Sequence, residues 1–126
     1  MVSFKTKLRS ADNTGAQILQ CIKIYGGFWR KTASLGDLIL VRSKKLKDQK
    51  KLEKKKMYFG LIVARKKKTY RKDGSYIRFD KNKVLLFNDQ NKFLGSRVYG
   101  PLCKEVRGGR NEVKYKQIIS FSGGSI

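Results

Sequence analysis

The 126-residue sequence contains no histidine, the side chain that most often serves as a general base near neutral pH. Its two cysteines, Cys21 and Cys103, lie far apart and form no C-x-x-C pair, whereas a structural zinc site needs about four ligands. Two free, buried thiols are the favoured interpretation, and a Cys21–Cys103 disulfide is the alternative. We therefore predict no metal site and no cofactor.

Acidic residues are also scarce, with 9 Asp and Glu in the whole chain. Asp12, Asp37, Asp73 and Asp80 each stand alone, and the first three lie next to Gly or Asn, as is typical of turns. No two carboxylates are paired for acid and base catalysis. We predict that the protein has no catalytic residue and is not an enzyme.

Long hydrophobic runs are missing too. No segment approaches the roughly 18–20 consecutive apolar residues that a membrane-spanning helix requires. The basic segments have no apolar face that would bind a membrane surface. The first five residues have neither the apolar core of a secretory signal nor the pattern of an organellar presequence. We predict no membrane partner and no cleaved leader.

Positive charge, in contrast, is abundant: 31 Lys and Arg give a formal net charge of +22. A polyanionic partner relieves the self-repulsion of so basic a domain, which favours nucleic acid as the partner. Residues 41–56 and 65–83 each contain nine basic and two acidic residues, and residues 57–64 between them are uncharged. A solubilising charged surface is the alternative, but two such runs beside one apolar segment favour nucleic-acid binding.

The apolar segments are short, as in strands. Continuous apolar runs at residues 38–41, 59–63 and 84–87 indicate strands that are buried on both faces. In the first ten residues, Phe4, Thr6 and Leu8 alternate with basic residues, which predicts one core face and one basic face. Together with the Ile-rich stretch that precedes Gly26, these runs give about five strands separated by turns. We predict a mainly β fold, a small five-stranded β-barrel.

A projecting β-hairpin is the clearest local prediction. Asp73 and Gly74 form a turn-favouring pair between basic arms at residues 69–71 and 76–80. Tyr70 and Tyr76 flank the tip, where their rings are suited to stack on unpaired bases. Arginines of the basic segments are suited to bidentate phosphate contacts, and lysines to act as mobile point charges.

Beyond the barrel core, which we place at about residues 1–98, the pattern changes. Pro101 and the glycines at 108–109 are spaced like the punctuation of a short helix, so we predict a short helical C-terminal part at residues 99–120. Alternating apolar residues after Asn111 fit a strand as an alternative. We expect residues 121–126 to be a flexible tail and the whole chain, 1–126, to be one domain.

The segment GGFWRK at residues 26–31 combines two glycines, two aromatic rings and two cations. The glycines allow close approach of a ligand to the backbone, and Trp29 is suited to stacking on RNA or docking to a protein. A glycine turn in which Trp29 covers the edge of the core is an equal alternative.

Several motifs, in order along nearly the whole chain, resemble those of one family. They are ADNTGA at residues 11–16, CIK at 21–23, GG at 26–27, GD at 36–37, GLIV at 60–63, DG at 73–74, Phe79, Asn82, GSRVYGP at 95–101 and IIS at 118–120. Together they resemble the universal large-subunit ribosomal protein numbered fourteen. The resemblance implies a structural constituent of the large ribosomal subunit with a five-stranded barrel, a projecting hairpin and a short helical C-terminal part.

The resemblance also implies partners. It implies binding to large-subunit rRNA, a bridge to small-subunit rRNA, contacts with ribosomal proteins of the families numbered three and nineteen, and docking of a ribosome-silencing factor. A free-standing RNA-binding regulatory module is the alternative function, although the scattered positions of Trp29, Tyr70 and Tyr76 argue against a dedicated stacking platform.

By resemblance, the hairpin contacts rRNA and residues 99–106 face proteins or the subunit interface. The predicted rRNA-binding residues are Arg9, Lys44, Lys45, Lys47, Lys50, Lys51, Lys54, Lys55, Lys56, Arg65, Lys66, Lys67, Lys68, Tyr70, Arg71, Lys72, Ser75, Tyr76 and Arg78. The predicted interface residues are Arg97, Tyr99, Pro101, Lys104 and Arg107.

The codon preference implied by the composition bears on which ribosome is involved. Lys, Asn, Ile, Phe and Tyr, which have A/T-rich codons, account for 49 of the 126 residues. The family match also begins within the first ten or so residues. Both observations favour a mitochondrially encoded protein of the mitochondrial ribosome, with a plastid or the bacterial cytoplasm as alternatives.

Overall fold

The chain folds mainly into β-strands. The computed structural model describes residues 2–14, 16–25, 31–46, 56–90, 92–95, 97–106, 116, 118–119 and 121. Its elements are β1 (Val2–Ser3), β2 (Lys7–Ser10), β3 (Ala16–Ile24), β4 (Thr32–Ala33), β5 (Leu38–Leu46), β6 (Met57–Ala64), β7 (Thr69–Tyr70), β8 (Tyr76–Ile77), β9 (Lys83–Phe87) and the 3-10 helix η1 (Lys104–Val106). The predicted mainly β class is confirmed.

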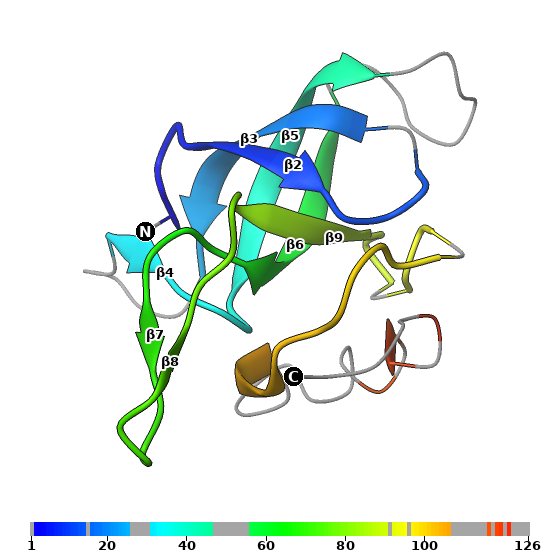
Figure 1. Ribbon diagram of the computed structural model, residues 1–126. Helices are drawn as coiled ribbons and strands as arrows, with labels where there is room; N and C mark the ends of the chain where they lie inside the picture. Colours follow the sequence, from blue (N-terminus) through cyan, green and yellow to red (C-terminus); the bar gives the residue numbers. More distant parts are fainter. Residues whose placement is uncertain are drawn as a thin grey trace.

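Five strands close into a barrel in the order β2-β3-β5-β6-β9 (Figure 1). Four of the five neighbouring pairs are antiparallel. A ring with an odd number of strands cannot alternate direction all the way round, so one neighbouring pair must be parallel. That pair is β2 with β9, where Arg9 lies opposite Lys83 and Ser10 opposite Val84. The predicted five-stranded barrel is confirmed.

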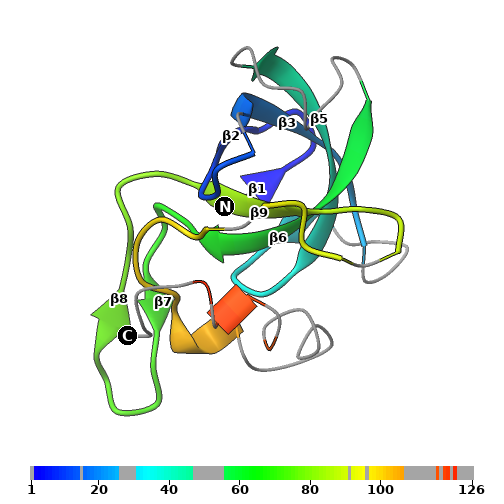
Figure 2. The ribbon, with the colours of Figure 1, turned by 90° about the vertical axis from the view of Figure 1, so that its right-hand side faces the viewer.

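Two of the three continuous apolar runs are largely buried on both faces, as predicted, whereas the run at residues 38–41 alternates between partly buried and buried side chains. All residues of β9 after Lys83 are buried, and so are the last five residues of β6. One face of these strands packs in the barrel interior against residues such as Leu8, Leu19 and Ile39. The C-terminal segment (residues 97–106) runs beside β6 and β9 in Figures 1 and 2. It contributes further buried side chains, among them Leu102 and Val106.

The alternation predicted for the first strand fails at Phe4, whose side chain is 61% exposed. Lys5 has a φ of 68°, a left-handed conformation that few non-glycine residues adopt. The amide of Thr6 donates to the carbonyl of Ser3 at 3.1 Å, which closes a turn around Phe4 and Lys5. A turn ends the period of two, so β2 begins only at Lys7, and Leu8 alone of the predicted core face is fully buried.

The predicted helical C-terminal part is reduced to short pieces. Residues 99–103 are not helical, and the described helix is the single turn η1. Lys116, Ile118 and Ile119 have helical backbone, and most of the remaining residues of 107–126 lie outside the described part of the chain. The helix prediction was wrong for residues 99–103, because Leu102 and Cys103 are buried against the core in a non-helical segment.

Asp12 is a buried carboxylate in the turn between β2 and β3. It accepts hydrogen bonds from the Thr14 amide at 3.2 Å, from the Thr14 hydroxyl at 2.5 Å and from the Ser10 hydroxyl. Its second oxygen accepts from the amide of Leu86 on β9 at 3.1 Å. The sequence predicted the turn but not this contact, which joins residues 74 positions apart at the closing edge of the barrel.

We expect Asp12→Ala to lower the free energy of unfolding by about 2–4 kcal/mol, because the buried Leu86 and Thr14 amides lose their acceptor. Urea unfolding followed by far-UV circular dichroism measures the change. Asp89→Ala, at an exposed turn position, is the control and should change stability by no more than about 0.5 kcal/mol. Equal stabilities of the two variants would contradict the role given to Asp12.

Candidate nucleic-acid interface

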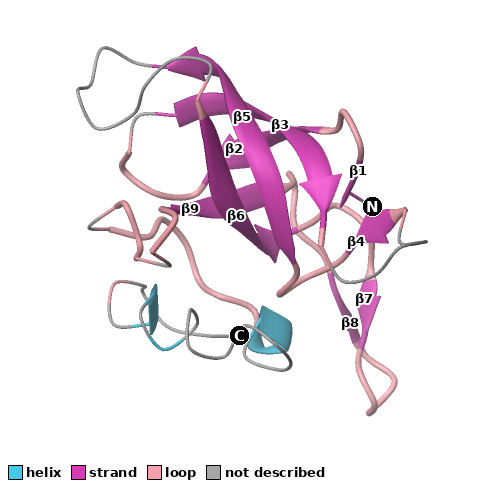
Figure 3. Ribbon diagram, turned by 180° about the vertical axis from the view of Figure 1, so that it is seen from behind, coloured by secondary structure: helices cyan, strands magenta, loops and turns pink. Residues whose placement is uncertain are grey.

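The described residues of the two basic segments lie at opposite ends of the barrel. Lys44 and Lys45 end β5, and Lys56 directly precedes β6, whereas Arg65 directly follows β6 and leads into the hairpin. Eight residues of strand at ~3.3 Å per residue separate the two ends by about 25 Å. Figures 1 and 3 show the far end of β5 and the β7–β8 hairpin on opposite sides of the molecule. The sequence placed both runs beside one strand, and the structure makes them two separate basic ends.

The hairpin forms as predicted. Tyr70 of β7 pairs with Tyr76 of β8, and the Arg71 amide donates to the Ser75 carbonyl at 2.8 Å. The Gly74 amide donates to the Arg71 carbonyl at 3.2 Å, and Gly74 has a φ of 91°. This geometry is that of a three-residue hairpin loop with glycine at its left-handed position.

Asp73 at the tip is engaged within the turn. Its carboxylate accepts from the Ser75 hydroxyl at 2.6 Å and from the Ser75 amide at 3.0 Å. These hydrogen bonds, the hydroxyl first, lower the pKa of Asp73 below its ordinary value. The aspartate therefore remains ionised and shapes the tip among the surrounding cations.

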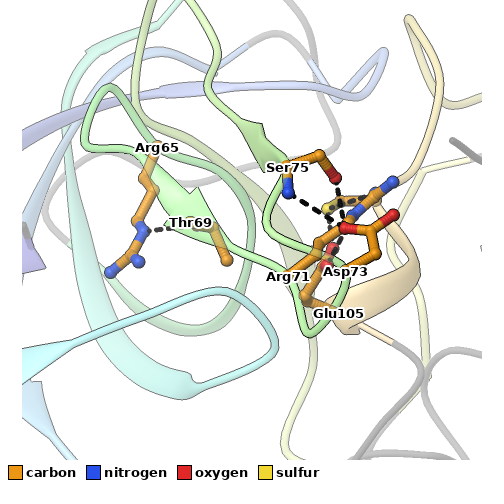
Figure 4. Close-up of polar contacts among 7 residues, drawn as sticks. Arg65, Thr69, Arg71, Asp73, Ser75 and Glu105 are labelled. Atoms are coloured by element: carbon orange, nitrogen blue, oxygen red, sulfur yellow. Dashed lines mark hydrogen bonds and ion pairs between the residues drawn. The ribbon is translucent and has the colours of Figure 1, made fainter.

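Asn82 fixes the base of the hairpin to the barrel. Its side-chain oxygen accepts from the Lys66 amide at 3.0 Å, and its carbonyl accepts from the Arg9 amide at 3.1 Å. Arg65 turns back onto the hairpin, where its Nε donates to the Thr69 hydroxyl at 3.0 Å (Figure 4). These contacts set the direction in which the hairpin leaves the barrel.

A second contact connects the hairpin to the C-terminal segment. The Arg71 Nε donates to the Glu105 carboxylate of η1 at 2.9 Å, and the Cys103 thiol donates to the same carboxylate (Figure 4). Burial alone raises the pKa of Glu105, but the hydrogen bonds from Cys103 and Arg71 outweigh it and lower the pKa. Two nitrogens of Arg71, Nε with Glu105 and Nη2 with Cys103, thus have partners within the chain, and the assignment of Arg71 to RNA stays a prediction.

The structure places most of the predicted contact residues on the surface. Exposed residues are Arg9, Lys44, Lys45, Lys56, Lys66, Lys67, Tyr70, Lys72, Ser75, Tyr76 and Arg78, and partly buried ones are Arg65, Lys68 and Arg71. Lys47, Lys50, Lys51, Lys54, Lys55 and Arg107 lie outside the described residues, as do positions 26–30 with Trp29. The exposure of these residues does not test whether they contact RNA, so the assignments stay predictions.

The register of the barrel also reveals residues that the sequence reasoning did not single out. Lys7 lies opposite Gln20, Gln20 opposite Arg42, and Arg42 opposite Met57, so these four form one row across four strands. Cross-strand partners share a face of the sheet. Among the described residues, the Arg42 Nε is the buried side-chain polar atom without a hydrogen-bond partner. Arg42 and Lys44 are two positions apart in the sequence, a spacing that places two residues of a strand on the same face. This spacing was the available signal.

The predicted protein interface lies on the segment that packs beside the turn of Asp12. The Tyr99 amide donates to the Ala11 carbonyl at 2.7 Å, and Val98 forms a bridge with Asp12. Tyr99 is 49% exposed, and the Arg97 guanidinium lies 5.5 Å from its ring centroid. Pro101 and Lys104 are also exposed, so the described interface residues are exposed side chains on a segment whose Leu102 and Cys103 are buried.

Two further predictions concern the chemistry of the chain. Cys21 and Cys103 are free and buried, as favoured, and burial raises the pKa of both thiols. In the described part of the chain, no group of three or more His, Cys, Asp and Glu is placed to hold a metal ion. None of the helices described is long and apolar enough to cross a membrane.

The chain is a small basic β-barrel protein. Its five-stranded barrel is closed, and cations lie on the hairpin and at both ends, which makes the surface suited to bind a polyanion. A sequence model of one family, ribosomal protein L14p/L23e, matches residues 1–125, and the chain belongs to this family. It is therefore a ribosomal protein of the large subunit, a constituent of the translation machinery with ribosomal RNA and ribosomal proteins as partners. The resemblance noted in the motifs is confirmed.

The Arg71–Glu105 contact predicts a pH dependence at the hairpin. Because the pKa of Glu105 is lowered, the contact is present above the ordinary value of 4.5 and is lost as the pH falls through the lower folded-state value. A titration that follows the NMR signal of the Arg71 Nε–H group should show a midpoint below 4.5. Glu105→Gln is the control and should remove this transition. A midpoint at or above 4.5 would contradict the contact.

Proposed function

We propose that the protein binds large-subunit rRNA through its two basic ends and contributes to a bridge with small-subunit rRNA. The observation that carries the proposal is the placement of exposed lysines at both ends of a neutral strand that spans about 25 Å, with Lys44, Lys45 and Lys56 at one end and Lys66 and Lys67 at the other. Two separate cationic ends can each neutralise phosphates of a different RNA segment, which stabilises the fold of the RNA. The role is structural, without a catalytic step.

Electrostatics within the barrel supports this proposal. Arg9 lies directly opposite Lys83 at the parallel closure, and like charges in that position destabilise a sheet. A phosphate bound between them relieves the repulsion. At the base of the hairpin, Lys66 and Lys67 are exposed, and at its tip the Asp73 carboxylate is engaged with Ser75.

The proposed surface for neighbouring proteins consists of the exposed residues Arg97, Tyr99, Pro101 and Lys104. Arg107, which lies outside the described residues, completes the predicted set. By the family resemblance, these are ribosomal proteins of the families numbered three and nineteen, and a ribosome-silencing factor. The backbone contacts of Tyr99 and Val98 with residues 11–12 fix this surface to the barrel. A fixed position favours recognition, because little conformational freedom is lost on binding.

We place the protein in the mitochondrial ribosome. The support is compositional: 49 of 126 residues are of the five types with A/T-rich codons, and Lys outnumbers Arg by 22 to 9. Such a bias is common in A/T-rich organellar genomes, and the plastid and the bacterial cytoplasm are the alternatives that a genome assignment would decide.

Binding to large-subunit rRNA transcribed in vitro tests the proposal. Simultaneous Lys66→Gln, Lys67→Gln and Lys68→Gln should weaken binding and make the slope of log affinity against log salt shallower by about 2, because counterion release scales with phosphate contacts. Filter binding across salt concentrations measures both quantities.

The matched control removes the same charge elsewhere, with Lys23→Gln, Lys31→Gln and Lys92→Gln, three exposed lysines outside the two basic segments. It should change the slope by less than about 1. Equal effects of the two triple variants would show that the hairpin is not a preferred contact, and failure of the unmodified protein to bind would overturn the proposed function.

A further inference from the structure

The hairpin presents two tyrosines on its solvent face. Tyr70 and Tyr76 are direct cross-strand partners, so both rings lie on one side of the β7–β8 ribbon. The next pair, Thr69 and Ile77, lies on the other side, where Ile77 packs against the core. The tyrosines are 72% and 53% exposed, which is unusual for two adjacent large rings on a hairpin that projects from its barrel (Figure 1).

The two rings and one lysine form a single composite surface. The ring centroids of Tyr70 and Tyr76 lie 6.2 Å apart at an interplanar angle of 60°, an edge-to-face contact. The Lys68 ammonium lies 4.4 Å from the Tyr76 centroid and covers part of that ring. Tyr70 is therefore the ring with the larger free surface, supported by the edge of Tyr76 and flanked by a cation.

Stabilising the hairpin is the simpler explanation for this pair. A pair with that role alone gains from burial, yet both rings remain mostly in water. Lys68 lies over the Tyr76 ring, and Lys66, Lys67 and Lys72 are exposed on the same strongly basic segment of the chain. An aromatic face beside several cations matches a nucleotide, which offers a flat base and a phosphate, better than it matches an apolar or basic protein surface.

We infer that Tyr70 and Tyr76 form one stacking site for a single unpaired nucleotide of the RNA, with its base on the free face of Tyr70 and its phosphate near Lys68. The base must be unpaired, because an A-form duplex keeps its base faces stacked inside the helix. Considered from the sequence, the two tyrosines were separate stacking candidates, and the register makes them one site. The inference rests on the proposed RNA-binding function. It adds that the β7–β8 hairpin binds RNA at an unpaired nucleotide.

Two short RNA duplexes with the same number of base pairs test it, one fully paired and one with a single bulged 2-aminopurine. The full-length protein should bind the bulged RNA about tenfold more tightly, the discrimination expected from stacking one base on an aromatic ring. It should also quench the 2-aminopurine fluorescence, since stacking quenches this base. The quenching is measured on the unmodified protein and does not depend on how any variant folds.

Variants then locate the site. Tyr70→Leu should remove the preference and the quenching, and Tyr70→Phe should retain both, because it keeps the ring. Phe4→Leu is the matched control: Phe4 is also exposed and also lies beside a cation, Lys5, but in the turn before β2. It should leave the preference for the bulged RNA unchanged.

The outcomes separate this inference from the proposed function. Equal binding of both RNAs without quenching would overturn the stacking site while leaving phosphate binding intact. Loss of the preference in Phe4→Leu and its retention in Tyr70→Leu would place stacking elsewhere and also overturn the inference. Binding of neither RNA at low salt would overturn the proposed function itself.

Discussion

The parallel contact between β2 and β9 closes the ring, and the hairpin and the C-terminal segment take their positions from it. Asp12 reaches across this closure to the Leu86 amide, and Asn82 connects the Arg9 amide on one side with the Lys66 amide at the hairpin base. The direction of the hairpin and the place of the C-terminal segment, which bonds to Ala11, therefore depend on the same edge. A change at the closure is expected to disturb stability and RNA contacts together.

Charge separation is the second constraint. The interior of the barrel is apolar, and each described lysine and arginine is exposed or partly buried, so their charges do not enter the core. The uncharged strand β6 acts as a spacer, because its length sets the distance between the ends. A protein of this kind contributes to an RNA assembly by occupying space between phosphates as well as by neutralising them.

Much of the fold was predictable from the sequence because strand runs and turn residues act locally. The continuous runs at 59–63 and 84–87 and the Asp73–Gly74 turn led directly to β6, β9 and the hairpin. Phe4 was misplaced because a left-handed Lys5 has no sequence signal of the kind that glycine gives. Arg71 and Glu105 are 34 positions apart, and no local sequence pattern predicts a contact over that separation. The composite tyrosine site likewise required the strand register, which only the fold supplies.

Sedimentation of a native lysate at high magnesium, with mass-spectrometric detection of this chain across the gradient, tests the central claim most directly. If the two basic ends hold the protein on ribosomal RNA, it will migrate with the large subunit and with assembled ribosomes and will stay there after a moderate salt wash. Recovery of the chain only from light fractions that lack ribosomal RNA would contradict the account.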